Sequence, residues 1–475
     1  MNKTLVYLIY FVVYSVFLLV VGKATSRASD SLDKFFVGER KMGVFRLFFT
    51  FVGTWLSAAT ILGFTGSIYN SGFSVIVTSV IPWFLGALLL YAISDRLYDA
   101  KVLTIPELLG RRYDSRWIQI LAALVMVACY IFYLVIQIKG FGIAVGKLLN
   151  IDYTGAVFLV YLFILYSTFG GFYSVVKTDA FNLIILTVSM GVIYYVIVRQ
   201  ADGVFFFTES MVRESAVWAG MPTGASRPLT FGAALTYMTA FFGWGMGLAT
   251  NPQYMVRMIS AGSKRTAKRM ILCSLAFLAV FYFVLTQIGL GLRVLFPGMS
   301  LYAGNDDVLI TAIHQLMYSR LSGFFLISII GACISTANSQ LLLIGSSLSY
   351  DVLSKIGTRK MEEDRILWLT RLFVFLGGTV SLIFSFNPPA DTLSYGGDIW
   401  GVFSVFFFPL VYGALYFKRG TKAGAYAAFI AGAVSGAAFF YMPLDIHWAF
   451  PATICSTAAY VLVSLKGSRK KEGDA

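Results

Sequence analysis

The sequence has 475 residues, of which 58% are hydrophobic and 13% are charged, and its mean hydropathy is +0.78. Soluble domains carry about 25% charged residues, so this chain lacks the polar side chains that would cover a water-facing surface. The net charge of +14 does not indicate a nucleic-acid partner, because the 37 Lys and Arg lie between the apolar runs. We therefore expect an integral membrane protein whose main solvent is the lipid bilayer.

The apolar runs are about twenty residues long and do not alternate with polar residues, which predicts an all-α polytopic chain and excludes a β-barrel. About thirteen transmembrane helices are expected. Their predicted ranges are 4–22, 46–69, 73–95, 117–148, 153–174, 178–199, 230–256, 270–295, 320–353, 366–387, 392–416, 423–441 and 447–465.

An odd number of spans places the two ends of the chain on opposite sides of the membrane. With the N-terminus outside, 29 Lys and Arg, Arg257 among them, fall on the cytoplasmic side and seven fall outside. The positive-inside rule therefore predicts a plasma or inner membrane protein with an outer N-terminus and a cytoplasmic tail at 466–475. The longest polar stretch, 200–229, is too short to bury a core, so we expect one membrane domain without a soluble domain.

Two of the spans contain helix-weakening residues. The second span carries Gly53, Ser57, Thr60 and Thr65, and the seventh carries Gly243, Gly245, Gly247, Asn251 and Pro252. Interrupted membrane helices at matching positions in two halves of a chain are typical of transporters with an inverted repeat and a site near the midplane. The two repeats would then cover 46–199 and 230–416. Glycines that serve only close helix packing are the alternative interpretation.

The ninth span contains an oxygen-rich patch in an otherwise apolar helix, within the run GACISTANSQ. Ser335, Asn338 and Ser339 are spaced to share one helix face, and Thr336 lies beside them. Neutral hydroxyl and carbonyl oxygens suit a hard monovalent cation. Hydroxyl groups that bond back to the helix backbone are the competing explanation.

Other function classes find little support in these residues. Two His and four well-separated Cys offer neither a catalytic pair nor a metal cluster, so we do not expect an enzyme. A repeated pore motif would indicate a channel, an output domain a sensor, and a phosphate-binding loop a primary pump. We find none of these features in the sequence. Secondary transport remains, with sodium as the expected coupling ion and protons as the alternative.

Several sequence motifs resemble the sodium:solute symporter family. They are DKFFVGERKMG, LTIPELLGRRYDSR, YSTFGGFYSVVKTD, NPQYMVRMISAGSKRTAKR and CISTANSQLL. The resemblance implies a leucine-transporter-like fold of five-plus-five inverted repeats, with an extra N-terminal helix at 4–22 and two C-terminal helices at 423–465. It also implies symport of a small organic solute, carboxylate-bearing or like an amino acid, vitamin or sugar, with sodium and without an obligate protein partner.

The resemblance also implies particular site residues. The main sodium site would consist of Gly53, Leu56, Ala332, Ser335 and Thr336. Some members hold a second sodium, for which Asp179, Ser335, Asn338 and Ser339 occupy the matching positions, although Asn338 stands where those members have Ser. A carboxylate favoured by the positive end of a helix dipole is an equal alternative for Asp179.

The solute is expected beside the sodium, between the two broken helices. The candidate contacts are Thr54, Trp55, Ser57, Gln137, Lys139, Trp244, Asn251 and the segment 395–400, which includes Tyr395, Asp398 and Trp400. Lys139 and Asp398 are charges at similar membrane depth, so we expect them to form part of an outer gate or to hold the solute. In the alternative, Lys139 extends to the interface and Asp398 caps an unwound segment.

Overall fold

The computed structural model describes residues 3–26, 31–168, 171–201, 231–301, 303–317, 319–357 and 361–473, and the regular secondary structure in these ranges is helical. Nine of the described helices are long and apolar enough to cross a membrane, and one bent pair of helices qualifies as a tenth span. The chain is therefore a multi-pass membrane protein. Most of the predicted polar stretch 200–229 and part of the YSTFGG motif lie outside the described residues.

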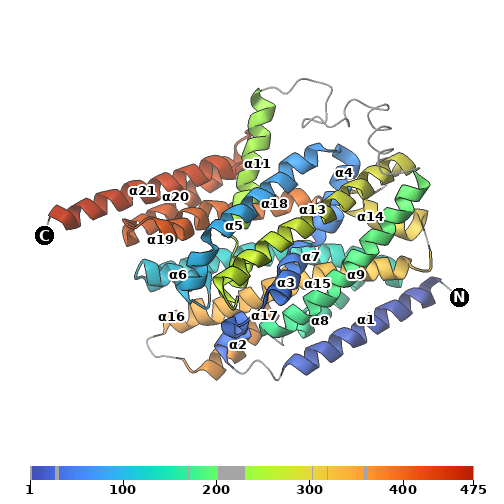
Figure 1. Cartoon of the computed structure of the whole chain (residues 1–475), viewed down its shortest axis with the longest axis horizontal. Coiled ribbons are helices and arrows are strands. Elements are labelled where there is room, and N and C mark those ends of the chain that lie inside the picture. Colours follow the sequence, from blue (N-terminus) through green and yellow to red (C-terminus); the bar gives the residue numbers. More distant parts are fainter. Residues whose placement is uncertain are drawn as a thin grey trace.

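The first half of the described chain begins with the long helix α1 (Figure 1). The second predicted span is interrupted, between α3 and η2. Its helices are α1 (Lys3–Ser26), α2 (Leu32–Val37), α3 (Val44–Trp55), the π-helical η2 (Ala59–Phe64), α4 (Thr65–Ser71), η3 (Ile76–Val80), α5 (Ile81–Ala100), α6 (Ile105–Arg112), α7 (Arg116–Leu149), α8 (Tyr153–Thr168) and α9 (Gly171–Gln200).

The second half contains the other interruption, between α11 (Phe231–Thr250) and α12 (Pro252–Ile259). The elements that follow are α13 (Lys264–Leu295), η4 (Met299–Leu301), η5 (Asn305–Asp307), α14 (Val308–Thr311), η6 (Ala312–Leu316), α15 (Ser322–Ser346), η7 (Ser347–Leu353), α16 (Ser354–Ile356), α17 (Glu363–Ser385), α18 (Thr392–Phe407), η8 (Phe408–Tyr412), α19 (Gly413–Tyr416), α20 (Lys422–Tyr441) and α21 (Ala449–Gly473). A described helix overlaps each predicted span.

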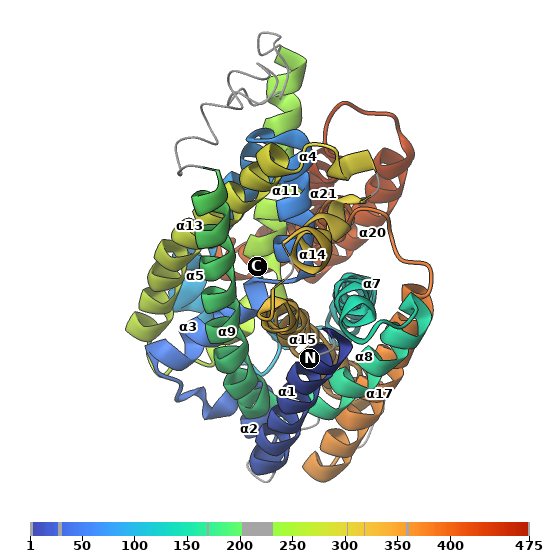
Figure 2. The same cartoon turned by 90° about the vertical axis from the view of Figure 1, so that its right-hand side faces the viewer.

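Helix α15 lies at the centre of the bundle, in contact with α1, α7, α8 and α9 (Figure 2). The apolar window of this span is entirely buried, whereas windows of the peripheral helices are less than half buried. A helix that carries hydroxyl and amide side chains is costly against lipid, and the surrounding helices shield these groups. The oxygen-rich patch of the ninth span therefore faces protein on every side.

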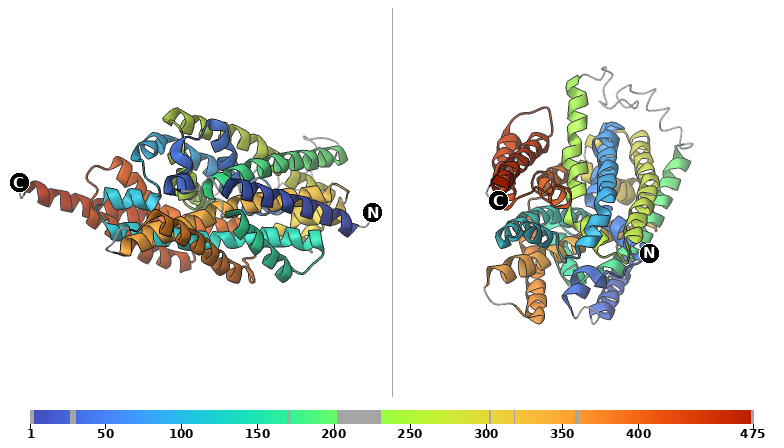
Figure 3. Two further views of the ribbon diagram at one scale, coloured as in Figure 1. Left: turned by 90° about the horizontal axis from the view of Figure 1, so that it is seen from below. Right: turned by 60° about the vertical axis from the view of Figure 1, so that its left-hand side comes forward.

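Several long helices, among them α1, α13, α20 and α21, run roughly along the longest axis of the molecule, whereas α11 runs across it, as Figure 1 shows. The start of α1 and the end of α21 lie at opposite ends of this axis, as Figure 3 also shows. Helices α20 and α21 pack against each other and cover one side of α18.

Close backbone contact joins α5 to α11. A Cβ atom added to Gly86 would lie 2.1 Å from the carbonyl oxygen of Gly245, so no other residue fits without a shift of the backbone. Small residues at such contacts let membrane helices approach closely, and dispersion contacts then stabilise the pair. Glycine packing therefore accounts for Gly245, which lies within the continuous helix α11, whereas the break in this span falls at Asn251.

We expect Gly86→Ala to lower the thermal unfolding midpoint of the purified protein in detergent, because overpacking costs about 1–3 kcal/mol. The matched control is Gly191→Ala on α9, where nothing lies within 4 Å of the added Cβ. That control should leave the midpoint unchanged or raise it, since Ala favours a helix over Gly by roughly 1 kcal/mol. Equal midpoints for the two variants would contradict the tight α5–α11 contact.

Candidate functional site

The second span is broken where the sequence predicts. Helix α3 ends at Trp55, η2 begins at Ala59, and the two segments differ in direction by 59°. Three side chains bond to the backbone around this break: Gln137 Oε1 accepts from Ala58 N at 3.1 Å, Thr60 Oγ1 donates to Trp55 O at 3.1 Å, and Thr336 Oγ1 donates to Thr54 O at 3.1 Å. Unwound backbone at membrane depth is tolerated only where protein satisfies it, and here the partners come from α7, η2 and α15.

The seventh span is broken at Asn251. Its side chain caps α12 by accepting from Gln253 N at 3.1 Å, and Pro252 is the first residue of that helix. Tyr130 donates to Asn251 Oδ1 at 2.6 Å and accepts from Gln253 N at 2.9 Å. Asn251 is thus a capping residue, and only its Nδ2 lacks a hydrogen-bond partner among the described residues.

The residues predicted for the main sodium site lie where the end of α3 meets the middle of α15. A Cβ atom on Gly53 would lie 3.0 Å from Ser335 Oγ, and Thr336 Oγ1 lies 3.4 Å from the carbonyl oxygen of Ala332. Leu56 follows α3 directly as its C-terminal cap. The last carbonyls of a helix have no partners within it and carry partial negative charge, so this junction presents oxygens suited to a cation.

Asp179 reaches the same junction from α9. Its carboxylate accepts from Ser335 Oγ at 2.5 Å and from Thr50 Oγ1 at 2.6 Å. The residue lies eight positions after the first residue of α9, beyond the first turn to which the dipole effect is confined. The interpretation of Asp179 as a helix-terminal carboxylate is therefore wrong, and its side chain is part of the oxygen-rich cluster.

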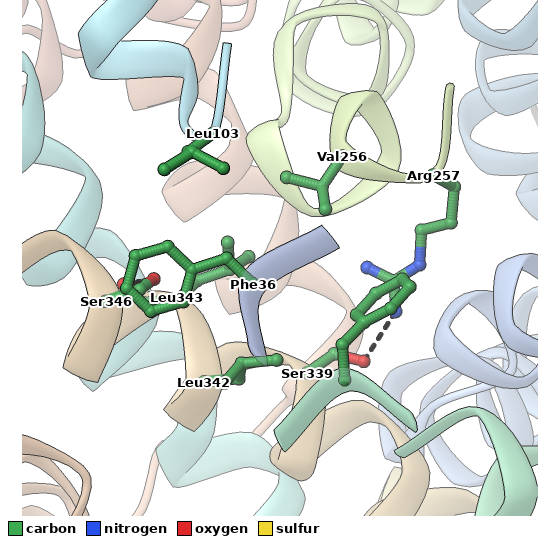
Figure 4. A pocket seen from close by; sticks show the side chains of 9 residues that line it. Phe36, Leu103, Val256, Arg257, Ser339, Leu342, Leu343 and Ser346 are labelled. Atoms are coloured by element: carbon green, nitrogen blue, oxygen red, sulfur yellow. Dashed lines mark hydrogen bonds between the residues drawn. The ribbon is translucent and has the colours of Figure 1, made fainter. Parts of the chain in front are cut away.

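Arg257 is the most important residue that the sequence analysis misplaced. It was assigned to the cytoplasmic group, yet its side chain is fully buried beside α3 and α15. Its Nη2 donates to Ser339 Oγ at 2.6 Å, to Thr54 Oγ1 at 2.7 Å and to Thr50 Oγ1 at 3.2 Å, and the first of these bonds is drawn in Figure 4. Hydropathy places Arg257 just beyond the end of a span, but every residue of α12 is buried, Arg257 among them.

The guanidinium of Arg257 donates hydrogen bonds to Ser339, a predicted ligand of the second sodium, and to the neighbouring Thr54. Ser339 Oγ accepts from Arg257 and lies 3.0 Å from Thr54 Oγ1. Asn338, the other predicted ligand on α15, is also buried. A second ion bound through Ser339 would have to share that hydroxyl with a fixed positive charge, or displace it.

Aromatic side chains from several helices meet next to the break in α3. Trp55 Nε1 donates to Tyr282 OH at 2.9 Å, and Trp244 contacts both Trp83 and Trp400, with ring centroids 5.0 and 4.9 Å apart. We call this set the aromatic cluster, and it consists of Trp55, Trp83, Tyr133, Trp244, Tyr254, Tyr282 and Trp400. The sequence analysis singled out only Trp55, Trp244 and Trp400 of this cluster among its candidate contacts, because 16% of the chain is aromatic and no local pattern marks the other rings.

The remaining solute candidates divide between two regions. Thr54, Ser57 and Gln137 are buried at or beside the break in α3. Tyr395 and Asp398 instead line a separate groove that also includes residues of α20. The structure therefore does not bring these two residues together with the rest of the predicted solute site.

Lys139 and Asp398, which the sequence analysis assigned together to an outer gate or to the solute, do not bond to each other. Lys139 Nζ forms an ion pair with Asp306 and also donates to the carbonyl oxygens of Pro389 at 2.8 Å and Ala390 at 2.9 Å. Asp398 Oδ1 instead accepts from Trp448 Nε1 at 2.9 Å. The sequence gives the depth of a charge along its own helix, but it does not say which way the side chain points.

Asp306 joins three parts of the chain at this end of the bundle. Besides Lys139 of α7, it accepts from Thr392 Oγ1 at 2.6 Å and from Thr392 N at 3.3 Å, at the start of α18. The neighbouring Asn305 packs on α4 so closely that a Cβ atom on Gly66 would overlap its carbonyl oxygen. The segment Asn305–Thr311 thus bridges α4, α7 and α18.

These features define a class of protein: a secondary transporter of the leucine-transporter-like fold, with two interrupted membrane helices and an oxygen-rich junction between the first of them and a central helix. A family model described as the sodium:solute symporter family matches residues 35–432. The chain belongs to this family. It is therefore a transporter and not an enzyme, and sodium is its coupling ion.

Individual proteins agree with the family model. A sodium/proline symporter of Staphylococcus aureus is 27% identical over 440 residues, which cover 89% of this chain and 83% of the relative. A Na+-coupled sialic acid symporter in a substrate-bound outward-open state superposes with a TM-score of 0.82 at 18% identity over 97% of both chains. Mhp1, a nucleobase-cation-symport-1 family transporter in a closed conformation, gives a TM-score of 0.62 at 13% identity over 93% of this chain and 96% of its own.

We predict that Ser335→Ala, and more strongly the double variant with Thr336→Ala, raises the sodium concentration for half-maximal uptake. Loss of an oxygen that contacts a charge costs about 1.5–3 kcal/mol, which corresponds to roughly tenfold or more. Ser328→Ala on the same helix is the control, because its hydroxyl only donates to the carbonyl oxygen of Phe325 at 2.7 Å. Wild-type sodium dependence in the double variant would place the sodium site elsewhere.

For the Lys139–Asp306 pair we expect Lys139→Asp and Asp306→Lys each to abolish uptake, and the double exchange to restore part of it. Breaking a buried ion pair costs about 3–5 kcal/mol, because it leaves one charge without its partner. Reversal of the exposed Lys268–Asp95 pair is the control and should change uptake little. Normal transport by both neutral variants, Lys139→Met and Asp306→Asn, would show that the pair has no role.

Proposed function

We propose that the chain moves a small organic solute bearing a carboxylate into the cell together with sodium, by alternating access. The observation that carries this proposal is the contact between the broken second span and α15, where Thr336 Oγ1 meets the carbonyl of Thr54 beside the aromatic cluster. A solute in the aromatic cluster would touch residues of the same broken helix whose carbonyls face the ion. Ion and solute could then stabilise the same arrangement of helices.

The aromatic cluster supports a compact solute with an apolar or ring face and a carboxylate. The large rings offer flat apolar surfaces, and a few polar groups beside them could fix orientation. Two buried N–H donors in this region, Trp83 Nε1 and Gln137 Nε2, have no hydrogen-bond partner among the described residues. Such donors suit a carboxylate, and the sodium/proline symporters among the relatives agree with an amino or imino acid as the solute.

Alternating access would require the two ends of the site to open in turn. At one end, Lys139 and Asp306 connect α7 to the start of α18. At the other, a cavity of only 10 Å³ lies below Arg257, lined by Phe36, Leu103 and Ser339 among others (Figure 4). This space holds about one water molecule, so movement of α2 or α6 would be needed to release a solute there.

The orientation that we propose for the chain in the membrane is based on the distribution of Lys and Arg between its two sides. With the end of α1 that carries Ser26 in the cytoplasm, the N-terminus is outside and the C-terminal tail is cytoplasmic, in a plasma or inner membrane. Lys139 and Asp306 would then lie on the outer side and Phe36 on the inner side. Repeats 46–199 and 230–416 would be the units that rearrange around the site.

The solute can be sought with a panel of amino acids, imino acids, sugars and vitamins in a thermal-shift assay on the purified protein, with and without sodium. Binding raises apparent stability by mass action, so a transported solute should raise the midpoint more when sodium is present. Uptake of that solute into proteoliposomes should then stop when sodium is replaced by choline at fixed pH. Uptake that persists in choline and follows the pH gradient would instead indicate proton coupling.

We further expect sodium and solute to tighten each other's binding by the same factor, because both bind across the α3–α15 junction. Calorimetric titration of solute at low and high sodium gives one factor, and titration of sodium with and without solute gives the other. Solute affinity that does not change with sodium concentration would contradict the shared junction.

A further inference from the structure

Helix α18 has two faces with different partners. Trp400 packs against Trp244 in the aromatic cluster. A stripe at helical spacing on another face, formed by Tyr395, Asp398, Ile399, Val402 and Phe406, lines a groove of 610 Å³ instead. Among the described residues that line the groove, Asp398 is the only charged one, and it lies about 9 Å along the helix from Thr392, where α18 begins.

The opposite wall of the groove is smooth and apolar. Gly432, Ala433, Gly436 and Ala437 of α20 present almost no side-chain bulk, and Phe440 follows them. Phe132 of α7 borders the groove and is 39% exposed. The volume falls within the 300–1,000 Å³ typical of small-molecule sites, and the lining is suited to a hydrocarbon body.

The carboxylate of Asp398 is only partly satisfied by protein. Its Oδ1 accepts from Trp448 Nε1 at 2.9 Å and lies 3.7 Å from His447 Nε2. At 3.7 Å this contact is too long for a hydrogen bond, so His447 does not satisfy the carboxylate. Among the described residues no hydrogen bond reaches Oδ2, and the side chain of Asp398 remains 39% exposed.

We propose that this groove binds an amphipathic amine from the bilayer, with the hydrocarbon body between α18 and α20 and the ammonium group on Asp398. A carboxylate at membrane depth is costly without a counter-charge, and an ammonium group supplies one. The described lining of the groove contains neither Lys nor Arg, so the phosphate of an aminophospholipid would find no counter-charge there beside Asp398. An amine without a phosphate is therefore the occupant that the charges favour.

The test uses photoreactive analogues of dodecylamine and dodecanol with the purified full-length chain in detergent, and locates the labelled residues by mass spectrometry. The amine should label the α18–α20 groove, and excess dodecylamine should remove this labelling. Asp398→Asn keeps an acceptor for Trp448 but removes the charge, so it should reduce amine labelling roughly tenfold. Labelling by the alcohol should stay the same in this variant.

Two further variants separate charge from shape. Gly436→Leu should fill the groove and reduce labelling by both probes, since a Cβ atom there already lies 3.6 Å from the Trp448 ring. Asp152→Asn removes an exposed carboxylate elsewhere, keeps an acceptor for Gly155 N, and should change neither labelling.

Three results would overturn the proposal. They are equal labelling of the native groove by amine and alcohol, an unchanged preference for the amine in Asp398→Asn, and competition by phosphatidylethanolamine but not by dodecylamine. Exclusion of both probes, with cross-links between two copies at α20, would identify the groove as a contact between copies instead and would also overturn it. None of these measurements requires sodium or a transported solute, so they stand apart from the test of symport.

Discussion

The rest of the structure depends on how the backbone is satisfied where the second span unwinds. Within a bilayer, N–H and C=O groups that leave a helix need protein partners, since lipid offers none. Gln137 and Thr336 supply two of these partners, one from α7 and one from α15. The same bonds hold both helices against the end of α3, so the Thr336 hydroxyl and the carbonyl oxygens of Thr54 and Ala332 lie together at this junction. The requirement for hydrogen bonds and the suitability for sodium thus have a common origin.

Buried charged side chains have different kinds of partner at the centre and at the end of the bundle. Arg257 and Asp179 do not form a direct ion pair, but both bond to Thr50, so opposite charges are connected through one hydroxyl. Lys139 and Asp306 bond directly, with backbone carbonyls around the ammonium group. In both places the partners belong to different elements, so a relative movement of these elements has to break or exchange bonds to charged groups. Such contacts favour a small number of discrete arrangements over continuous deformation.

Helix α18 contacts the aromatic cluster on one face and the groove beside α20 on another. Gly396 and Gly397 let the Trp244 ring approach its backbone, while Asp398 turns toward α20 and the lipid-facing groove. Residues of α20 and Trp448, which directly precedes α21, line that groove. These C-terminal elements therefore determine what the carboxylate of Asp398 contacts.

The sequence by itself determined the class of fold, the approximate span boundaries and the positions of both interruptions, because hydropathy, Gly and Pro act on the chain locally. It also identified the oxygen-rich patch of α15, where helical spacing and resemblance pointed to the same residues. Only the tertiary structure decided that Arg257 is buried at the centre, that Lys139 pairs with Asp306, and which aromatic rings form one cluster. These facts depend on which helix faces meet across long sequence separations. Local periodicity carries no such information, because a helix break can redirect every side chain that follows it.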